Sequence, residues 1–258
     1  MALLETKGLS VAFGGLWAVN GVDFQMDVGD VVGLIGPNGS GKTTFLNLIS
    51  GLYQPSCGQI LLDGEDITSL KPYEIFRKGI GRTYQNSRLC WNLSVIDNVM
   101  LGLNSKHEMG FFNHVFRAKK SDAEIFRHFE KALELLHYFN PQLVDKKYEL
   151  AQNITHIDRR RVELSRILVS EPKVILIDEL TAGLNQEETL RIMDDIKKVK
   201  SWLPNIGMII IEHDMNVMQS IPNKIVVFNA GEKIAEGTYD QIIQDEQVIN
   251  AYLGGAAV

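Results

Sequence analysis

The segment of residues 36–43 constrains this chain more than any other stretch. It reads G-P-N-G-S-G-K-T and matches the phosphate-binding pattern G-x-x-x-x-G-K-[ST] at every fixed position. The apolar run 31–35 before it predicts a buried strand, and the run 44–49 after it, which stops at Gly51, predicts a helix. Because strand, loop and helix follow in the order that this pattern requires, the sequence predicts a phosphate-binding loop here.

The residue types in this loop fit the binding of a nucleoside triphosphate. Glycines let backbone N–H groups turn toward a polyphosphate where a Cβ would block the approach, and the positive end of the next helix strengthens that field. We expect Lys42 to bind the β- and γ-phosphates and the hydroxyl of Thr43 to bind Mg²⁺. The residues expected to contact the nucleotide in this segment are Gly36, Pro37, Asn38, Gly39, Ser40, Gly41, Lys42, Thr43 and Thr44. The alternative, a glycine-rich loop that binds no nucleotide, is disfavoured by the matching strand and helix.

Length and charge narrow the classes of protein further. With 258 residues the chain can form one large α/β domain, or one domain with a smaller appendage. A net charge of −6 gives no overall attraction to nucleic acid, so we expect no nucleic-acid partner. Cys57 and Cys90 lie in no metal or redox spacing, which suits a reducing compartment. No signal peptide and no apolar run near the ~20 residues of a membrane span is apparent, so membrane association is expected through another protein.

Strand signals form two blocks that flank a helical stretch. The expected strands are residues 3–13, 19–24, 31–35, 59–62, 80–84, 174–179, 208–211, 224–228 and 233–236. Helices are expected at 44–49, from Pro72 to near Gly79, from the capping run 185–188 to before Pro204, and at 238–243 and 247–253. This pattern predicts an α/β fold.

The middle of the chain lacks strand signals. Residues 94–97 begin one expected helix, and a capping box at 121–124 begins a longer one with Ile125, Phe129, Leu133 and Leu136 on its apolar face. Residues 106–120 between them are expected to form a loop with helical turns. We therefore expect a helical insertion at residues 86–167 in an α/β body of residues 1–85 and 168–258.

Three further positions suit a triphosphatase. The apolar strand 174–179 ends in an acidic pair, in which Asp178 is expected to hold the Mg²⁺ water shell and Glu179 to orient or deprotonate the attacking water. His213 ends the next strand, where a neutral imidazole would bridge the γ-phosphate and the catalytic carboxylate; the alternative is a surface histidine. Gln85 ends an expected strand and is a candidate Mg²⁺ ligand or sensor of the γ-phosphate.

Together these motifs resemble the ATP-binding cassette (ABC) ATPases over essentially the whole chain. The order is Phe13, GPNGSGKT, Gln85, VILIDE, AGLN and His213. The match narrows to the ATP-binding subunits of branched-chain amino-acid importers, which carry runs similar to FGGLWAVNGV, GIGRTYQNSRL, EHDMNVMQSI and VINAYLG. The resemblance implies a P-loop NTPase with a RecA-like core, an antiparallel β subdomain and a helical insertion, as one ABC ATPase domain over residues 1–258.

The resemblance also implies roles and partners. Phe13 would stack on adenine, Lys42, Gln85, Glu179 and His213 would act in catalysis, and Mg²⁺ would bind Thr43, Gln85 and Asp178. The chain would use ATP and Mg²⁺ at the cytoplasmic face of the cell membrane. It would work with transmembrane permease subunits, a second ABC ATPase subunit and, indirectly, a periplasmic or extracellular substrate-binding protein. The permease would dock near residues 85–103, with Arg88, Leu89 and Trp91 as candidate contacts.

Two positions depart from the family pattern. Where the family has an LSGGQ-like signature, this chain reads I-T-H-I-D at residues 154–158. Thr155 still provides a capping hydroxyl, but Ile157 replaces a glycine whose backbone touches the γ-phosphate, so we expect that contact to be lost. Leu180 replaces the proline after the acidic pair, which changes loop stiffness and no ligand. The triple arginine 159–161 is expected to form a solvated, salt-bridged helix face.

These departures leave more than one functional hypothesis. The main one is a hydrolysing subunit of an importer, paired with a different cassette whose signature is sound. The altered signature motivates a second, a regulatory nucleotide-binding subunit with weak turnover. A soluble ABC protein that works on DNA or ribosomes is disfavoured, because such proteins usually carry two cassettes in one chain or a long coiled-coil insert, and this sequence has neither.

Overall fold

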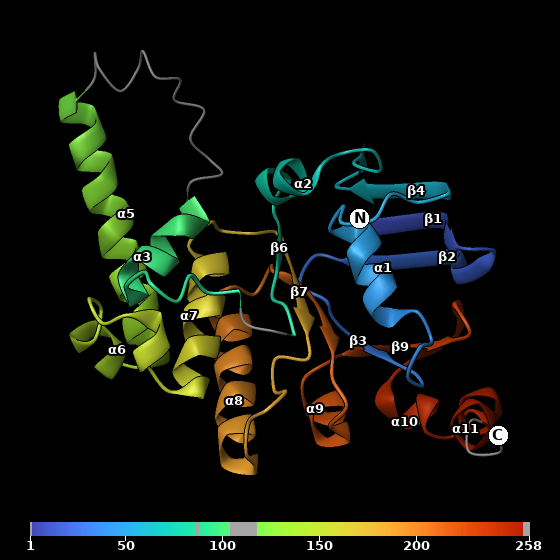
Figure 1. Ribbon diagram of the computed structural model, residues 1–258. Helices are drawn as coiled ribbons and strands as arrows, with labels where there is room; N and C mark the ends of the chain where they lie inside the picture. The colour runs from blue at the N-terminus through green and yellow to red at the C-terminus, as the bar shows by residue number, and fades with distance from the viewer. Residues whose placement is uncertain (1, 86–87, 104–117, 255–258) are drawn as a thin grey trace. The chain divides into compact units, whose positions relative to one another are not determined.

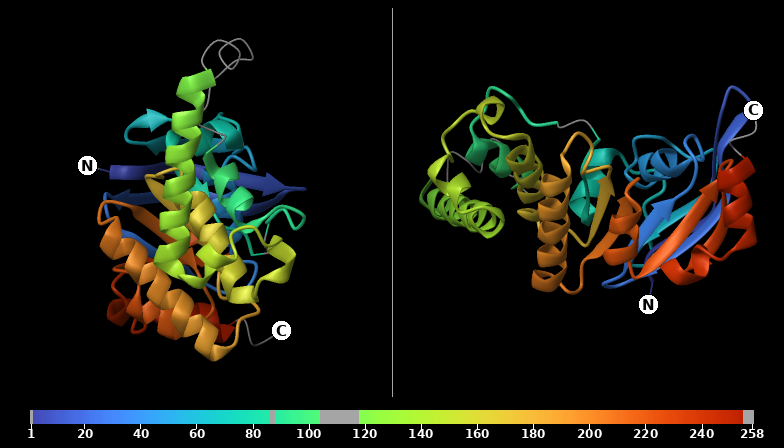
Figure 2. Two further views of the ribbon diagram at one scale, coloured as in Figure 1. Left: turned by 90° about the vertical axis from the view of Figure 1, so that its left-hand side faces the viewer. Right: turned by 90° about the horizontal axis from the view of Figure 1, so that it is seen from below.

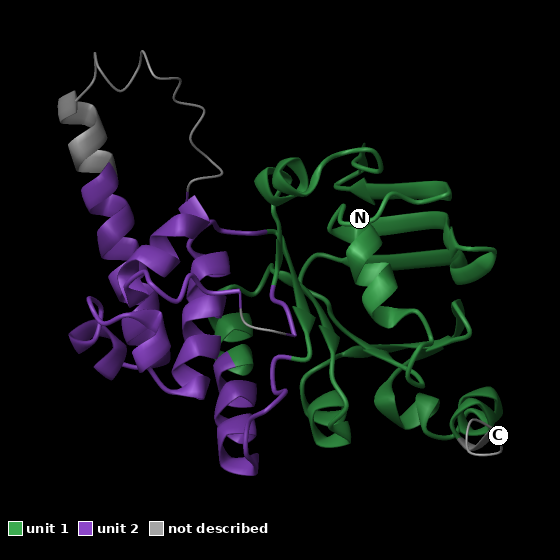
Figure 3. Ribbon diagram, viewed as in Figure 1, with its two compact units in different colours: residues 1–82, 173–179, 196–258 green, residues 83–172, 180–195 purple. Residues whose placement is uncertain are grey.

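The computed structural model describes residues 2–85, 88–103 and 118–254 (Figure 1). By its contacts the chain divides into two compact units, coloured separately in Figure 3. The first unit comprises residues 1–82, 173–179 and 196–258, and the second comprises residues 83–172 and 180–195. The second unit therefore includes a segment beyond the expected 86–167 insertion, and that insertion as a separate subdomain stays a prediction. No helix among the described residues is long and apolar enough to cross a membrane.

The larger sheet of the first unit carries the ends of several parallel strands at one edge. Among the described residues it has six strands in the order β10-β9-β3-β8-β7-β6. Their bounds are β3 Val31–Ile35, β6 Ile80–Arg82, β7 Val174–Asp178, β8 Gly207–Ile211, β9 Lys224–Asn229 and β10 Glu232–Gly237. Only β10 pairs antiparallel. Strands β3, β7 and β8 are buried at every residue, as continuous apolar runs predict for the middle of a parallel sheet.

A second sheet in the same unit is antiparallel, in the order β2-β1-β4-β5. Its strands are β1 Ala2–Phe13, β2 Leu16–Asp27, β4 Cys57–Leu62 and β5 Glu65–Asp66. Strands β1 and β2 form the long hairpin visible in Figure 2. Gly14 and Gly15 turn it with φ of 56° and 88°, a conformation that side chains resist. The antiparallel sheet expected from the family resemblance is thus present.

Helix α1, Lys42–Ile49, packs between the two sheets of the first unit through a chain of aromatic rings. Phe45 of α1 lies 5.4 Å from Phe24 of β2 and 5.2 Å from Phe228 of β9, measured between ring centroids. All three rings are at most 2% exposed. Burying each such side chain contributes about 1.5–3 kcal/mol, so this stack fixes the helix that follows the phosphate-binding loop.

Three of the remaining helices of the first unit begin and end near the expected residues: α2 Pro72–Lys78, α10 Tyr239–Ile242 and α11 Glu246–Gly254. Helix α9, Met215–Ser220, was not predicted. Pro72 starts α2 and Gly79, with φ of 111°, ends it. Helix α8, Gln186–Trp202, begins with the predicted capping box, in which Asn185 and Glu188 each accept the other's backbone N–H at 3.0–3.1 Å.

The second unit is helical in its described residues. Its elements are α3 Val95–Met100, η1 Leu101–Leu103, α5 Ala118–Phe139, α6 Gln142–Asp145, η2 Ala151–Asn153, α7 His156–Leu168 and the first part of α8. Helices α3 and α5 both pack on α7, as Figures 1 and 2 show. Helix α7 is therefore the centre of this unit, and most of its residues are buried.

Helix α5 differs from its predicted form in two ways. It is already helical at Ala118, so the capping box expected at 121–124 lies inside the helix; residues 118–120 are Ala-Lys-Lys, which favour helix. Its buried positions are Ala132, Leu135, Leu136 and Phe139, whereas Ile125, expected on the apolar face, is 54% exposed. The buried positions described for α5 therefore lie toward its C-terminal end. Residues 104–117, most of the expected loop, lie outside the described residues.

Candidate functional site

The phosphate-binding loop closes around its own lysine. The Nζ of Lys42 donates hydrogen bonds to the carbonyl oxygens of Gly36 at 2.8 Å and Pro37 at 3.0 Å. Burial lowers the pKa of Lys42, and the negative charges of Glu179 and Asp178 partly oppose this shift. The lysine is thus a buried cation that feels the charge of both carboxylates, and its predicted role in binding phosphates stays a prediction.

Two glycines let this loop pack against neighbouring strands. Gly36 has a φ of 146°, and a Cβ built on it would lie 2.0 Å from the carbonyl oxygen of Phe228. Gly41 has a φ of 104°, and its Cβ would lie 2.4 Å from the carbonyl oxygen of Ala18. A side chain at either position would displace backbone atoms, which explains the residue type at these two places. The turn between β9 and β10 also holds the loop, because the N–H of Gly231 donates to the Ser40 carbonyl at 3.0 Å.

The acidic pair and the histidine lie at the same edge of the large sheet as the loop. Strand β8 lies between β3 and β7, and all three run parallel. Parallel strands present their carboxyl ends at one edge, where α/β proteins bind ligands. Residues 36–43 follow β3, Asp178 and Glu179 end or follow β7, and His213 follows β8. The structure therefore brings these predicted residues of the first unit together.

Glu179 and His213 form a close pair at this edge. The Nε2 of His213 lies 2.8 Å from Oε1 of Glu179, and the glutamate side chain is 18% exposed against 57% for the histidine. Glu179 has a φ of 49°, in the left-handed region that residues other than glycine seldom adopt. Such local strain is typical of functional positions, because the surrounding structure must hold it. Of the two alternatives for His213, this geometry favours the histidine that contacts the catalytic carboxylate.

Asp178 is held by an arginine that the sequence analysis missed. Nη2 of Arg82 donates to Oδ2 of Asp178 at 2.8 Å, and both side chains are 5% exposed. Nη1 of the same arginine donates to Oγ of Ser50 at 2.8 Å. A signal was present in the sequence: Arg82 is a lone charge in a short run of apolar and glycine residues, and a buried charge requires a partner.

The expected adenine contact is an exposed ring at the end of β1. Phe13 is 49% exposed, and its ring packs edge-to-face against Tyr53 with centroids 5.2 Å apart at 71°. The free face of such a ring can stack on a base. Tyr53, which the sequence analysis did not single out, supports the ring from its edge. The role of Phe13 in binding adenine stays a prediction.

The oxygen donors expected for Mg²⁺ are divided between the two units. Thr43 and Asp178 belong to the first unit, where Thr43 is exposed and Asp178 is buried. Both carry the hard oxygen ligands that Mg²⁺ prefers. Gln85 belongs to the second unit, where its carbonyl oxygen accepts from Nη2 of Arg160 at 2.9 Å. Among the described residues, no cluster of three His, Cys, Asp or Glu side chains forms a separate metal site. The residues present fit Mg²⁺ bound mainly by water and nucleotide oxygens.

The altered signature begins helix α7. Thr155 caps the helix as expected, because its Oγ1 accepts the N–H of Asp158 at 3.3 Å. Ile157 is only 6% exposed, so its side chain is turned into the unit. The ring of His156 lies against Gly183, where a Cβ would come within 3.2 Å of its Cε1. Both His156 and Ile157 therefore stand where the family pattern has small residues, and the ring of His156 changes this part of the signature as much as Ile157 does.

The triple arginine does not form the solvated face that the sequence predicted. Arg160 is 2% exposed and Arg161 is 9% exposed. Arg161 Nε donates to Asp195 Oδ2 at 2.8 Å, and Arg160 binds backbone carbonyls. Helix α7 is the centre of its unit, so these positions face neighbouring segments, and each charge is matched inside. The prediction that Leu89 is an exposed contact at a docking surface is also wrong, because Leu89 is 4% exposed.

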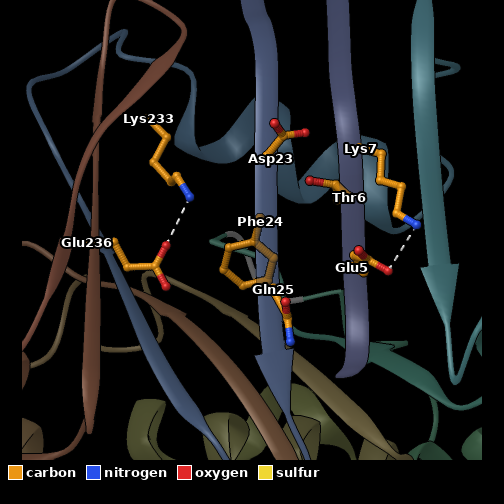
Figure 4. Close-up of a pocket in the computed structure, with 8 residues that line it drawn as sticks. All are labelled: Glu5, Thr6, Lys7, Asp23, Phe24, Gln25, Lys233 and Glu236. Atoms are coloured by element: carbon orange, nitrogen blue, oxygen red, sulfur yellow. Dashed lines mark hydrogen bonds and ion pairs between the residues drawn. The ribbon is translucent and has the colours of Figure 1, made fainter. Parts of the chain in front are cut away.

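A separate hollow of about 480 Å³ lies between β1, β2 and β10 (Figure 4). Its lining residues are Glu5, Thr6, Lys7, Asp23, Phe24, Gln25, Lys233 and Glu236. Figure 4 shows two ion pairs in its lining, Lys7 with Glu5 at 3.5 Å and Lys233 with Glu236 at 2.9 Å. No residue predicted to bind nucleotide lines it, so this hollow is distinct from the phosphate-binding loop.

Comparison with known proteins decides the family. Residues 19–182, more than half of the chain, match the family model described as ABC transporter. The chain belongs to the ABC transporter family. Residues 232–258 of this ABC cassette match a second model, described as branched-chain amino acid ATP-binding cassette transporter. The second match covers β10 and the helices that follow, including Tyr252. Burial raises the pKa of Tyr252, and a hydrogen bond with the Gly36 backbone partly opposes this shift.

Relatives match the ABC cassette along its whole length. The high-affinity branched-chain amino acid transport ATP-binding protein BraF of Pseudomonas aeruginosa is 39% identical, and the alignment covers 98% of each chain. The corresponding protein LivG of Escherichia coli is 36% identical over 98% of each. A crystal structure of the ADP conformation of an ATP-binding cassette of an ABC transporter superposes with a TM-score of 0.81, at 27% identity, over 98% of this chain and 99% of that one.

These comparisons confirm the predicted fold class and the predicted activity. The chain is an ABC-type ATPase with the P-loop NTPase fold, and it is an ATP-binding subunit of transport systems of the importer type. Nucleotide binding by this family is confirmed as well. The roles of individual residues are a matter of geometry and stay predictions.

Proposed function

We propose that this ABC cassette hydrolyses ATP to drive the uptake of branched-chain or related amino acids. The names of BraF and LivG support the class of substrate, and the match of residues 232–258 to the branched-chain amino acid model supports it independently. The observation that carries the hydrolytic role is the pair of His213 and Glu179, 2.8 Å apart beside the buried Asp178 at the loop edge of the sheet. A regulatory subunit would not need this pair.

The residues of the first unit divide the work of hydrolysis among them. Lys42 and the backbone N–H groups of residues 36–44 bind and orient the phosphates of ATP. They stabilise the negative charge that spreads over the oxygens of the γ-phosphoryl group in the transition state. Glu179 accepts a proton from the attacking water, and His213 holds the carboxylate in place. Thr43 and Asp178 would hold Mg²⁺, with Gln85 as the further ligand expected from the sequence, and the ion would supply positive charge to neutralise the phosphate oxygens.

The cassette works with other chains at a membrane. It is a peripheral subunit at the cytoplasmic face of the cell membrane, bound to transmembrane permeases that receive substrate from a periplasmic or extracellular binding protein. Trp91 is a contact for the permease: its ring is 41% exposed and lies 5.0 Å from Cζ of Arg159. An exposed indole with an arginine over its ring is typical of interface anchors.

The second ATPase subunit is a different chain. The groups of the first unit for ATP binding, Lys42, Thr43, Asp178, Glu179 and His213, are all of the expected types, whereas the signature carries His156 and Ile157 in place of small residues. A homodimer would put this signature over both nucleotides, and a heterodimer puts it over one. The weakly hydrolysing regulatory subunit remains the second candidate, because the same two side chains favour it.

Purification from membranes tests this proposal. A tagged chain should bring down permease subunits and a second ABC ATPase of different sequence. In proteoliposomes, ATP hydrolysis by the complex should rise when the binding protein is loaded with leucine, isoleucine or valine. Association with no membrane subunit, or hydrolysis that ignores amino acids of this class, would overturn it.

A further inference from the structure

Within the second unit, Arg160 of α7 binds two consecutive backbone carbonyl groups, those of Tyr84 and Gln85. Arg160 Nη1 donates to the carbonyl oxygen of Tyr84 at 3.2 Å, and Nη2 donates to that of Gln85 at 2.9 Å. Arg160 is 2% exposed, so its guanidinium makes these hydrogen bonds from a buried position. These bonds attach the main chain at Gln85 to α7 beyond the end of β6, which stops at Arg82 and not at residue 84 as expected.

Two more residues on the same side of α7 extend this attachment. Oε1 of Glu163 accepts the N–H of Arg88 at 2.9 Å, and Nη1 of Arg166 donates to the Arg88 carbonyl at 2.8 Å. Oε2 of Glu163 also pairs with Nη1 of Arg160 at 3.2 Å. Residues 160, 163 and 166 are three apart and lie along one side of the helix. They hold residues 84, 85 and 88 by both carbonyl and N–H groups.

The same guanidinium also binds the loop that follows Glu179. Nη2 of Arg160 donates to the carbonyl oxygen of Ala182 at 3.3 Å. The chain passes from the first unit to the second between residues 82 and 83 and again between residues 179 and 180. Arg160 thus binds both segments that enter the second unit: the one that contains Gln85 and the one that follows Glu179.

We infer that Arg160 is a positioning residue for Gln85. By fixing the Tyr84 and Gln85 carbonyls to α7, it sets the position from which the amide side chain of Gln85 extends. By binding Ala182 as well, it attaches both connecting segments to the same helix. The inference rests on the proposed role of Gln85 at the metal and the γ-phosphate, and its test separates the two.

Only an arginine meets this geometry. Its planar fork presents several N–H groups in fixed directions, so one side chain reaches three carbonyls and a carboxylate. Lysine keeps the positive charge beside Glu163 but has one nitrogen, which cannot span carbonyls on two segments. Arg160→Lys therefore removes the attachment while sparing the buried charge pair, whereas alanine would leave Glu163 buried and unpaired and endanger folding.

A double-mutant cycle in the reconstituted transporter tests the inference. We expect Arg160→Lys to lower kcat about tenfold, which corresponds in free energy to about one charge-assisted hydrogen bond. The KM for ATP should be unchanged, because the phosphate-binding loop is intact. The Mg²⁺ concentration for half-maximal rate should rise. If Arg160 acts through Gln85, the double variant with Gln85→Ala should be no slower than Gln85→Ala alone.

Hydrogen exchange gives a readout that does not depend on turnover. Arg160→Lys should speed amide exchange in peptides that cover residues 83–89 and 180–184, relative to wild type. Arg191→Lys is the matched control: it lies in the same unit, is exposed, and pairs only with Glu187 one helical turn away in the interactions found for it. That control should leave both exchange and hydrolysis unchanged.

The outcomes are distinguishable. If Gln85→Ala has no effect on kcat or on Mg²⁺ dependence, the proposed role of Gln85 fails and takes this inference with it. If Gln85→Ala slows hydrolysis but Arg160→Lys does not, the inference alone is wrong. Fully multiplicative losses in the cycle, or exchange that matches the Arg191→Lys control, would also overturn it.

Discussion

The guanidinium of Arg82 and the carboxylate of Asp178 form a buried ion pair across strands β6 and β7, with Nη2 and Oδ2 2.8 Å apart. The two residues end neighbouring strands of the large sheet. Asp178 is the carboxylate expected at Mg²⁺, and Arg82 orients it from the side. The arginine that neutralises this carboxylate also donates to Oγ of Ser50, just after α1, so one side chain links three parts of the first unit.

Removing one partner of this pair should destabilise the fold. Arg82→Met leaves a buried carboxylate without its arginine, and the free energy of unfolding should fall by about 3–5 kcal/mol. Urea denaturation of the isolated chain measures it. The double variant Arg82→Met with Asp178→Asn should lose less than Arg82→Met alone, because no charge is then left unpaired. A loss below about 1 kcal/mol for Arg82→Met would show that the pair contributes no more than a surface salt bridge.

Substituting the proposed general base should separate binding from turnover. Glu179→Gln keeps the shape and a hydrogen bond to His213 but loses the basicity that the attacking water needs. We expect ATP binding to remain and kcat to fall by about 10²–10⁴-fold. Nucleotide titration and steady-state hydrolysis in the full complex measure the two effects. Glu187→Gln, an exposed carboxylate on α8, is the control, and near-normal turnover by Glu179→Gln would remove Glu179 from the catalytic role.

The exposed ring at the end of β1 should affect nucleotide affinity alone. Phe13→Ala removes the stacking face for adenine and should weaken ATP binding by about 1–2 kcal/mol, roughly 5- to 30-fold. Fluorescence titration with an ATP analogue measures the dissociation constant. Tyr73→Ala, which deletes another exposed aromatic side chain of the same unit, should have no effect. Equal affinities for Phe13→Ala and wild type would assign adenine to another residue.

The proposed heterodimer predicts that the two ATP sites are unequal. The productive site is the one built on Lys42 of this chain, which faces the sound signature of the partner cassette. Lys42→Ala should abolish most hydrolysis in the reconstituted complex, because the buried cation that binds the phosphates is lost. The equivalent substitution in the partner should cost much less. Equal losses, or brisk hydrolysis by this chain as a homodimer, would contradict the asymmetric arrangement.

The sequence by itself determined the nucleotide-binding half of this protein. The pattern 36–43, the acidic end of β7 and the position of His213 are local features, set by residue types and by strands whose continuous apolar runs leave one way to be buried. Each such signal depends on neighbours in the chain. For that reason the strands, the loop and the family could be predicted without coordinates, and the structure and the comparisons confirmed them.

Tertiary structure alone decided which charges are buried and what they hold. The sequence analysis singled out neither Arg82 nor the partners of Arg160, and the triple arginine was expected to be solvated. Their partners are Asp178, 96 residues away, and the Tyr84 and Gln85 carbonyls, 76 and 75 residues away. Residue type cannot reveal such partners, because a buried charge is stabilised by groups that only packing brings within hydrogen-bond distance.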